Sequence, residues 1–213
     1  MSVGFNGVDS RTYATIATLH NHGIFTAGGM LVGSHAYGVI LNRMGIRGTR
    51  FTTDDVDLDR KAPSTAFREV GRSRFRVDLL VPSRDESFPI VPVPELKAYA
   101  LGLSYLDYLL AESQMGGVIA REGCCPVRVP FPERFALHKL VVSQRRKARE
   151  LKSQKDLLQA ATLCAALAEM HPGALEEASV KLPKKAQKHL RRGLEVARPL
   201  LANHPRVFDE LGK

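Results

Sequence analysis

The stretch TTDDVDLDR, residues 52–60, alternates acidic with apolar residues. Successive side chains of a β-strand point to opposite faces, so Asp55 and Asp57 lie on the same face. Two carboxylates about 4 Å apart repel by roughly 4 kcal/mol at an effective dielectric constant of about 20. A divalent cation removes that repulsion, and carboxylate oxygens suit Mg²⁺ or Mn²⁺. The pattern therefore predicts a metal site, and the alternative is an acidic edge strand that faces water.

A third carboxylate follows in FRVDLLV, residues 75–81, where Asp78 stands among apolar residues. The alternation predicts a β-strand here. A carboxylate inside an apolar strand is costly unless it is paired or bound to a metal. If this strand lies beside the one that carries Asp55 and Asp57, the three carboxylates converge.

Upstream, LVGSHAYG at residues 31–38 predicts an apolar strand that turns at Gly33 and Ser34 into a helix. Glycine lets the backbone approach a ligand closely. The free N–H groups at a helix start favour phosphate, and the Ser34 hydroxyl adds a hydrogen-bond donor. The alternative is an ordinary Gly-Ser turn without a ligand.

The remaining periodicities predict an α+β fold, with a mixed β-sheet core flanked by helices and a C-terminal helical lobe. The predicted domains are residues 1–131 and residues 132–213. Helices are predicted at 10–21, 35–43, 133–146, 150–170 and 184–201, a partly helical segment at 95–112, strands at 28–32 and 75–81, and a hairpin at 117–121 and 126–129. The helix at 184–201 gathers basic residues away from its apolar stripe: Lys184, Lys185, Lys188, Arg191 and Arg192.

Composition favours a basic protein of a reducing compartment. The net charge of +9 and a pI of about 9.7 favour polyanions such as RNA, DNA or phosphorylated ligands. Cys124, Cys125 and Cys164 are odd in number and form no CxxC pair, so a cytoplasmic location is expected and a disulfide framework is not. No apolar run suits a membrane span and no secretory signal is visible, so no membrane partner is expected.

Taken together, the motifs resemble the DNA polymerase β-like nucleotidyltransferases. Residues 129–146, VPFPERFALHKLVVSQRR, and residues 152–163, KSQKDLLQAATL, are similar to minimal bacterial nucleotidyltransferase-like families, including the AbiEii and MenT toxin relatives. The resemblance implies that Asp55, Asp57 and Asp78 are the catalytic carboxylates and hold Mg²⁺ or Mn²⁺.

The same resemblance implies a nucleotide site. Gly33 and Ser34 would hold the β- and γ-phosphates of a nucleoside triphosphate, Lys139 would neutralise them, and Lys155 and Asp156 would support the site. Lys139 has an alternative interpretation, a lysine whose stem covers a helix face while its ammonium reaches water. Asp156 would orient Lys139 or an arginine, or else pair within its own helix.

The expected activity is transfer of a nucleoside monophosphate from the triphosphate to a hydroxyl acceptor. RNA, and tRNA first, is the expected acceptor because of the net charge, with a protein or a small molecule as alternatives. Another hypothesis is a non-catalytic nucleic-acid-binding or toxin–antitoxin module on the same fold, with an antitoxin protein as partner. The presence of all three acidic residues favours the enzyme.

Overall fold

The computed structural model describes residues 4–47, 66–68, 76–83, 89–94, 97–145 and 151–212. Strands and helices mix before residue 131, and the described residues after it form helices without strands, which confirms the α+β class. The chain divides into two compact units, residues 1–51 with 108–213, and residues 52–107. The predicted domain boundary after residue 131 falls between the last strand and a helix, and it stays a prediction.

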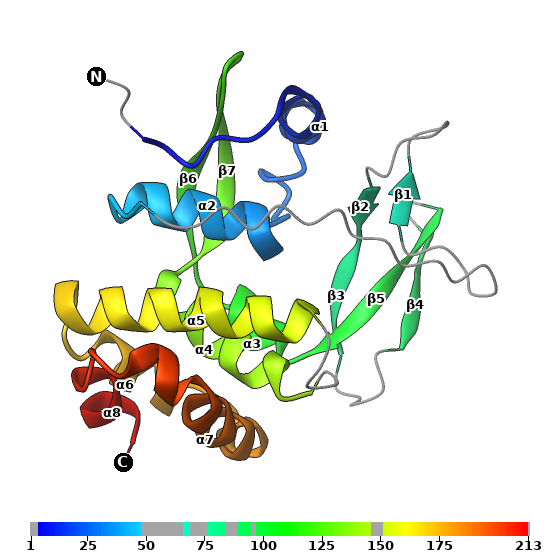
Figure 1. The fold of residues 1–213 in the computed structure, drawn as a ribbon. Coiled ribbons are helices and arrows are strands. Elements are labelled where there is room, and N and C mark those ends of the chain that lie inside the picture. The colour runs from blue at the N-terminus through cyan, green and yellow to red at the C-terminus, as the bar shows by residue number, and fades with distance from the viewer. Residues whose placement is uncertain are drawn as a thin grey trace. The chain divides into compact units, whose positions relative to one another are not determined.

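Two helices and a hairpin form the first part of the larger unit (Figure 1). They are α1 (Ser10–Asn21), α2 (Gly33–Arg43), β6 (Ser113–Ala120) and β7 (Gly123–Pro130). The carboxylate of Asp9 caps α1 by accepting from the backbone N–H groups of Arg11 and Thr12, both at 3.0 Å. Gly23, with φ of +75°, ends it in the left-handed region. The predicted start and end of this helix are confirmed.

The antiparallel hairpin is confirmed and is longer than predicted. Its register pairs Ala120 with Gly123 around a two-residue turn, and α1 and α2 both pack against it. The predicted strand at 28–32 is wrong. These residues form no strand, and Leu31 N–H donates one hydrogen bond of 2.8 Å to the Arg128 carbonyl of β7. This single hydrogen bond does not add a strand to the β6–β7 hairpin. The backbone turns just before it, where the Gly29 N–H donates to the Ile24 carbonyl at 2.8 Å.

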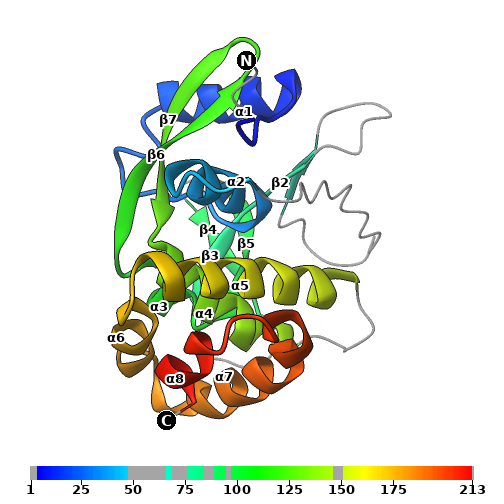
Figure 2. The same cartoon turned by 60° about the vertical axis from the view of Figure 1, so that its left-hand side comes forward.

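The second part of the larger unit is helical (Figure 2). It comprises α4 (Pro132–Ser143), α5 (Leu151–Met170), α6 (Ala174–Val180), α7 (Lys184–Ala197), the short helix η2 (Arg198–Leu201) and α8 (Arg206–Leu211). The long helices α4, α5 and α7 lie where periodicity predicts them, whereas the short helices α6 and α8 were not predicted. Helix α4 packs against α5, α6 and α7. The core side chains of α4 and α5 are fully buried: Phe135, Leu137 and Leu140 on α4, and Leu163 and Leu167 on α5.

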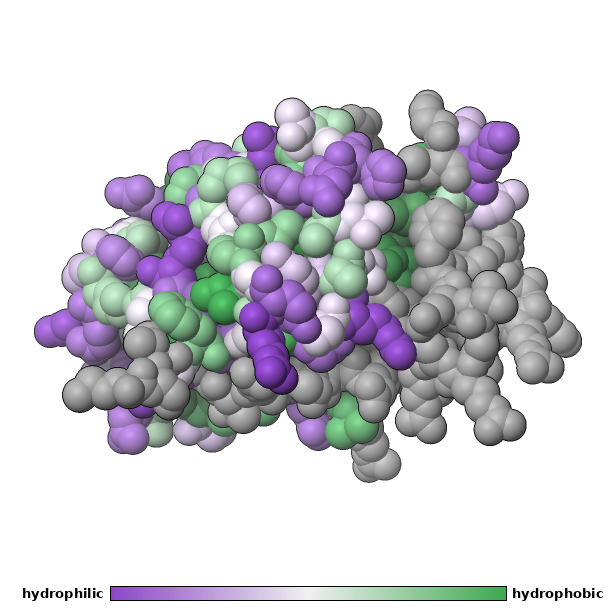
Figure 3. All heavy atoms as spheres, turned by 90° about the horizontal axis from the view of Figure 1, so that it is seen from above, coloured by the Kyte–Doolittle hydropathy of each residue, from purple (hydrophilic) through white to green (hydrophobic). Residues whose placement is uncertain are grey.

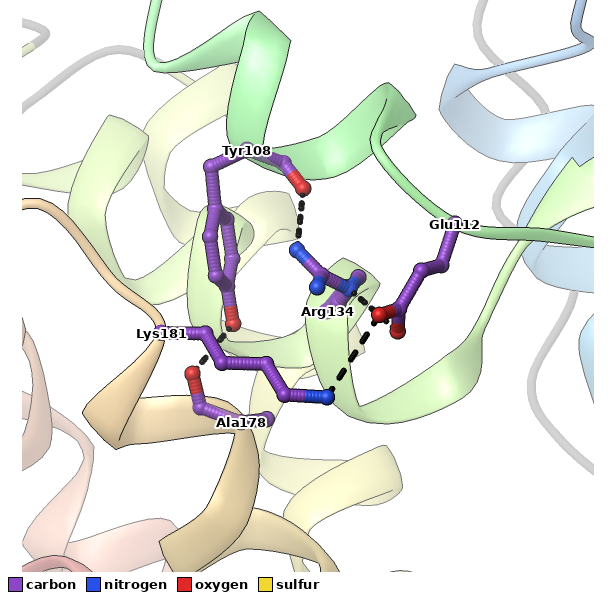
Figure 4. A network of polar contacts seen from close by, with 5 residues as sticks. All are labelled: Tyr108, Glu112, Arg134, Ala178 and Lys181. Carbon is purple, nitrogen blue, oxygen red and sulfur yellow. Dashed lines mark hydrogen bonds and ion pairs between the residues drawn. The ribbon is translucent and has the colours of Figure 1, made fainter.

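A polar cluster holds the start of α4 (Figure 4). The buried guanidinium of Arg134 donates through Nε to Glu112 at 3.0 Å and through Nη1 to the Tyr108 carbonyl at 2.7 Å. It also lies over the Tyr108 ring, 4.8 Å from the centroid. The Tyr108 hydroxyl donates to the Ala178 carbonyl, and Lys181 approaches Glu112 at 3.4 Å. The cluster therefore ties α4 to α6 and to the residues before β6.

The smaller unit contains short strands. These are β1 (Ala66–Arg68), β2 (Arg76–Asp78), β3 (Leu80–Ser83), β4 (Ile90–Val93) and β5 (Ala98–Ser104), and α3 (Leu106–Leu110) follows at its junction with the larger unit. β1 and β2 pair antiparallel, whereas β5 lies between β3, to which it is parallel, and β4, to which it is antiparallel.

The predictions for this unit are met in part. The single strand predicted at 75–81 is two strands in different sheets, interrupted at Leu79. The prediction that 95–112 is partly helical is confirmed by α3, whereas the strand β5 before it was not predicted. β5 was not recognised because it is a central strand with both edges paired, and apolar residues run along most of its length without clear alternation.

The face at the top of Figure 1 is shown in space-filling form in Figure 3. Strongly hydrophilic residues are scattered over it between weakly hydrophobic ones, as on a surface in contact with water. Within the described ranges, no helix has the length and apolar character needed to span a bilayer.

Candidate active site

Of the three predicted metal ligands, only Asp78 lies within the described residues; Asp55 and Asp57 lie outside them. Asp78 is the last residue of β2, opposite Ala66 of β1, and it is exposed. The expectation that it stands inside an apolar strand is wrong, because the strand ends there. An exposed carboxylate meets no desolvation cost, so burial gives no argument for a metal at this residue. Its role as a ligand stays a prediction.

The chemistry of the predicted ligand set decides which ion it suits. Within the part of the chain that the structure describes, no three His, Cys, Asp or Glu side chains gather closely enough to hold an ion. A site made by Asp78 would therefore draw its other ligands from outside that part. Three carboxylates offer oxygen donors alone, which suit Mg²⁺ or Mn²⁺ and not a zinc site built on His and Cys.

Lys139 of α4 and Asp156 of α5 form an ion pair where the two helices pack. The side chains are 13% and 3% exposed, so the carboxylate is almost completely removed from water. The interpretation in which the Lys139 ammonium reaches past the helix face into water is therefore wrong, because the ammonium pairs with Asp156 instead. Asp156 orients Lys139, one of the partners expected for it. A buried ion pair costs desolvation energy and is weak support for stability alone, so a role beyond packing is favoured.

Aromatic rings connect this pair to α2. The Lys139 ammonium lies 5.4 Å from the centroid of the Phe135 ring, one turn earlier on α4. Phe135 in turn stacks on Tyr37 of α2, with centroids 6.3 Å apart. Tyr37 is 3% exposed, so it belongs to the core and is not available to stack on a base. The position of Lys139 relative to α2 is therefore set by packed rings.

Helix α2 begins at Gly33, two residues before the predicted start. Gly33 has φ of +73°, a left-handed conformation that favours glycine. Val32, at the N-cap, offers no side-chain acceptor to the first N–H groups, so the cap residue itself leaves them open to water or a ligand. Together with the positive end of the helix dipole and the Ser34 hydroxyl, this helix start is suited to a phosphate.

The start of α5 faces the start of α2, and the two helices run in the same direction (Figures 1 and 2). Desolvation lowers the pKa of His35, Asp9 opposes the shift, and the nearby charge of Lys155 adds to it. Two residues further along α2, burial raises the pKa of Tyr37, and the Thr162 side chain of α5 opposes that change. The structure therefore brings Lys155, as well as Lys139, toward the helix start that holds Gly33 and Ser34.

Gln159 lies on α5 between Lys155 and Thr162, and it was not predicted as a site residue. Residues 155, 159 and 162 are spaced to fall on one stripe of the helix. Gln159 is 0% exposed, and within the described residues neither its amide oxygen nor its nitrogen has a hydrogen-bond partner. The spacing from Lys155 is visible in the sequence, but the burial is not. Phe135 and Tyr37 were also missed as positioning residues, because nothing local links residues 98 positions apart.

The arrangement gathers positive charge around a helix start, as a site for a polyphosphate requires. A family model described as "Nucleotidyltransferase" matches residues 58–182, more than half of the chain. The matched range includes Asp78, Lys139, Lys155 and Asp156, whereas the other four predicted site residues precede it: Gly33, Ser34, Asp55 and Asp57. No curated protein and no solved structure matches the chain.

Proposed function

We propose, from the premise that this chain belongs to the nucleotidyltransferase family, that it is a Mg²⁺-dependent enzyme of the DNA polymerase β-like type. Family membership makes it a transferase of phosphorus-containing groups that moves a nucleoside monophosphate. The proposal adds a nucleoside triphosphate as donor, a hydroxyl acceptor and Asp55, Asp57 and Asp78 as the metal-binding carboxylates.

The observation that carries the proposal is the buried Lys139–Asp156 pair beside the start of α2. An ammonium has three N–H donors, and Asp156 takes one of them. The 13% of the Lys139 side chain that stays exposed leaves it in reach of a ligand. A lysine held this way is a positioned point charge, the kind of group that binds a triphosphate without needing to move.

The chain's own residues then have separate tasks. The N–H groups at Gly33 and Ser34 hold the terminal phosphates, and Lys139 and Lys155 neutralise them, with Asp156 fixing Lys139. Bound Mg²⁺, held by the three carboxylates, supplies a Lewis acid for the triphosphate and the acceptor hydroxyl. The acceptor oxygen forms a bond to the α-phosphorus, the bond to pyrophosphate breaks in line, and Asp78 takes the hydroxyl proton. These residues act almost entirely by position and charge.

We assign RNA as the first candidate acceptor, with tRNA foremost, and we include an antitoxin protein as a candidate partner through the similarity to AbiEii and MenT. The net charge of +9 supports a polyanionic acceptor. The three cysteines are free, which suits the reducing cytoplasm proposed for this protein.

The decisive experiment follows the label of each α-³²P nucleoside triphosphate, with Mg²⁺, into total cell RNA or protein. Wild type is compared with Asp55→Ala/Asp57→Ala, for which we expect a loss of about a thousandfold or more, because several kcal/mol of charge stabilisation disappear. Asp54→Ala/Asp59→Ala removes the same charge from the same stretch and serves as the matched control.

Each result separates one hypothesis. Label in RNA supports the proposed acceptor, and label in protein replaces it. If Asp55→Ala/Asp57→Ala labels as well as wild type, the metal site is wrong. Absence of label from both fractions for every nucleotide favours the non-catalytic nucleic-acid-binding alternative.

A further inference from the structure

Helix α7 has two opposite faces. Its buried side packs into the helical part of the larger unit: Ala186, Leu190, Gly193, Leu194 and Ala197. Its exposed side carries five basic residues: Lys184, Lys185, Lys188, Arg191 and Arg192. At 3.6 residues per turn these five fall within an arc of about 120°, centred opposite the buried side. We call this arc the basic face of α7.

The basic face of α7 has no carboxylate partners within the described residues, whereas several other cations of the larger unit do. Arg134, Lys139 and Arg206 all pair with carboxylates. None of the five residues of the basic face forms an ion pair within the described part of the chain. The acidic residue of α7, Glu195, lies at the end of the same side and is held by Arg198 through bonds of 2.7 and 3.0 Å. Five uncompensated charges on one short surface repel one another, and an external polyanion relieves that repulsion.

The basic face is fixed rigidly to the helix that carries Lys139. Gly193 lies so close to α4 that a Cβ there would be 2.5 Å from the Leu140 carbonyl oxygen. Leu140 directly follows Lys139, so α7 rests on α4 at the level of the candidate site. The face therefore has one orientation relative to the Lys139–Asp156 pair.

We propose that the basic face of α7 binds the phosphate backbone of the RNA acceptor. This proposal rests on the proposed function, because the bound strand is taken to be the acceptor of the transfer. The binding itself does not require catalysis. From Lys184 to Arg192 the helix rises about 12 Å, which is long enough for these charges to contact more than one phosphate of the same strand. Charges on a helix surface, with no base-reading aromatic among them, predict binding without sequence preference.

A membrane surface is the other polyanion to consider, and the structure disfavours it. Helices that lie on membranes bury an apolar face in the lipid while basic residues reach the headgroups. The apolar side of α7 is already occupied, since Leu190 and Leu194 are each 3% exposed against the rest of the unit. What remains is charge without an inserting surface, which fits a nucleic-acid backbone.

The test measures binding of a fluorescein-labelled single-stranded RNA of mixed sequence over a range of salt concentrations. Lys188→Gln/Arg192→Gln removes two charges from the centre of the basic face. We expect binding about tenfold weaker and a slope of log Kobs against log salt that falls in magnitude by about 1.4, because each lost phosphate contact contributes about 0.7 for a single strand. Lys97→Gln/Arg121→Gln removes two exposed basic residues elsewhere and keeps the same net charge as the test variant.

The control makes the outcome decisive. A change in the α7 variant alone supports the proposal. Equal losses in both variants would mean that overall charge binds RNA and would overturn it, as would binding to phosphatidylserine vesicles without binding to RNA. RNA binding is measured without a nucleotide, so it can support the basic face even if the protein transfers no nucleotide. Conversely, if the α7 variant binds RNA as well as wild type, the basic-face proposal fails while the proposed nucleotide transfer is not contradicted.

Discussion

Helix α4 carries two buried cations five residues apart, and they are held in different ways. Arg134 is 6% exposed, and its carboxylate partner Glu112 is 44% exposed. Lys139 is 13% exposed, and its partner Asp156 is 3% exposed. In the first pair only the cation is buried, whereas in the second both groups are.

This contrast indicates that the Arg134 pair has a structural role and that the Lys139 pair belongs to the candidate site. Arg134 is also satisfied by the Tyr108 carbonyl and the Tyr108 ring, and the hydrogen bond from Arg134 holds the pKa of Glu112 below its ordinary value. These contacts join α4 to its neighbours and face no predicted ligand. Asp156 instead holds an ammonium beside the start of α2, at the cost of burying a carboxylate. The burial of both charged groups therefore favours a functional role for the Lys139–Asp156 pair.

The largest effect is expected from Lys139→Met. The substitution leaves the Asp156 carboxylate buried without the ammonium, which should lower the free energy of unfolding by about 3–5 kcal/mol. Urea denaturation measures the loss, and transfer of labelled nucleotide by the folded fraction should also fall sharply.

The double variant Lys139→Met/Asp156→Leu separates the two roles of this pair. Replacing both charges by apolar groups should recover most of the stability, because no buried charge remains unpaired. Transfer should stay lost. A double variant that regains both stability and transfer would show that the pair only supports the fold.

A smaller effect is expected from Arg134→Met. The Tyr108 carbonyl loses its donor and the ring loses its cation, so the free energy of unfolding should fall by about 1–3 kcal/mol. Transfer per folded molecule should not change. Lys181→Met, which removes an exposed contact to the same Glu112, should change stability by less than about 0.5 kcal/mol. A stable but inactive Arg134→Met would reverse the roles assigned to the two cations.

The smallest effect on stability is expected from Gln159→Leu. Replacing a fully buried amide that lacks a partner among the described residues by an apolar group of similar size should be neutral or slightly stabilising. If the amide serves the nucleotide site beside α2, the KM for the nucleotide should rise about three- to tenfold, the value of one hydrogen bond. Gln154→Leu changes an exposed glutamine of the same helix and should leave the KM unchanged. An unchanged KM in Gln159→Leu would restrict Gln159 to packing.

Local signals in the sequence predicted the elements that local contacts build. The helix predicted at 10–21 and the hairpin near residues 117–129 depend on residues within a few positions of one another, and both are confirmed. The apolar stripe of α7 likewise follows from helical spacing alone. The strand predicted at 28–32 is absent, the one at 75–81 is divided between two sheets, and β5 was not predicted, because strand pairing with distant residues decides whether an apolar run becomes a strand.

Sequence patterns were sufficient to predict the α+β class and the long C-terminal helices, and they supplied the residues proposed for a nucleotide site. The packing of distant segments was needed to show that Asp156 pairs with Lys139, that both lie near the start of α2, and that Asp78 is exposed. Helix caps and helical periodicity depend on residues within one or two turns of one another, and therefore they can be recognised in short stretches of sequence. Burial and the pairing of charges depend on which surfaces of the folded chain exclude water from one another, and that is settled only when distant segments pack.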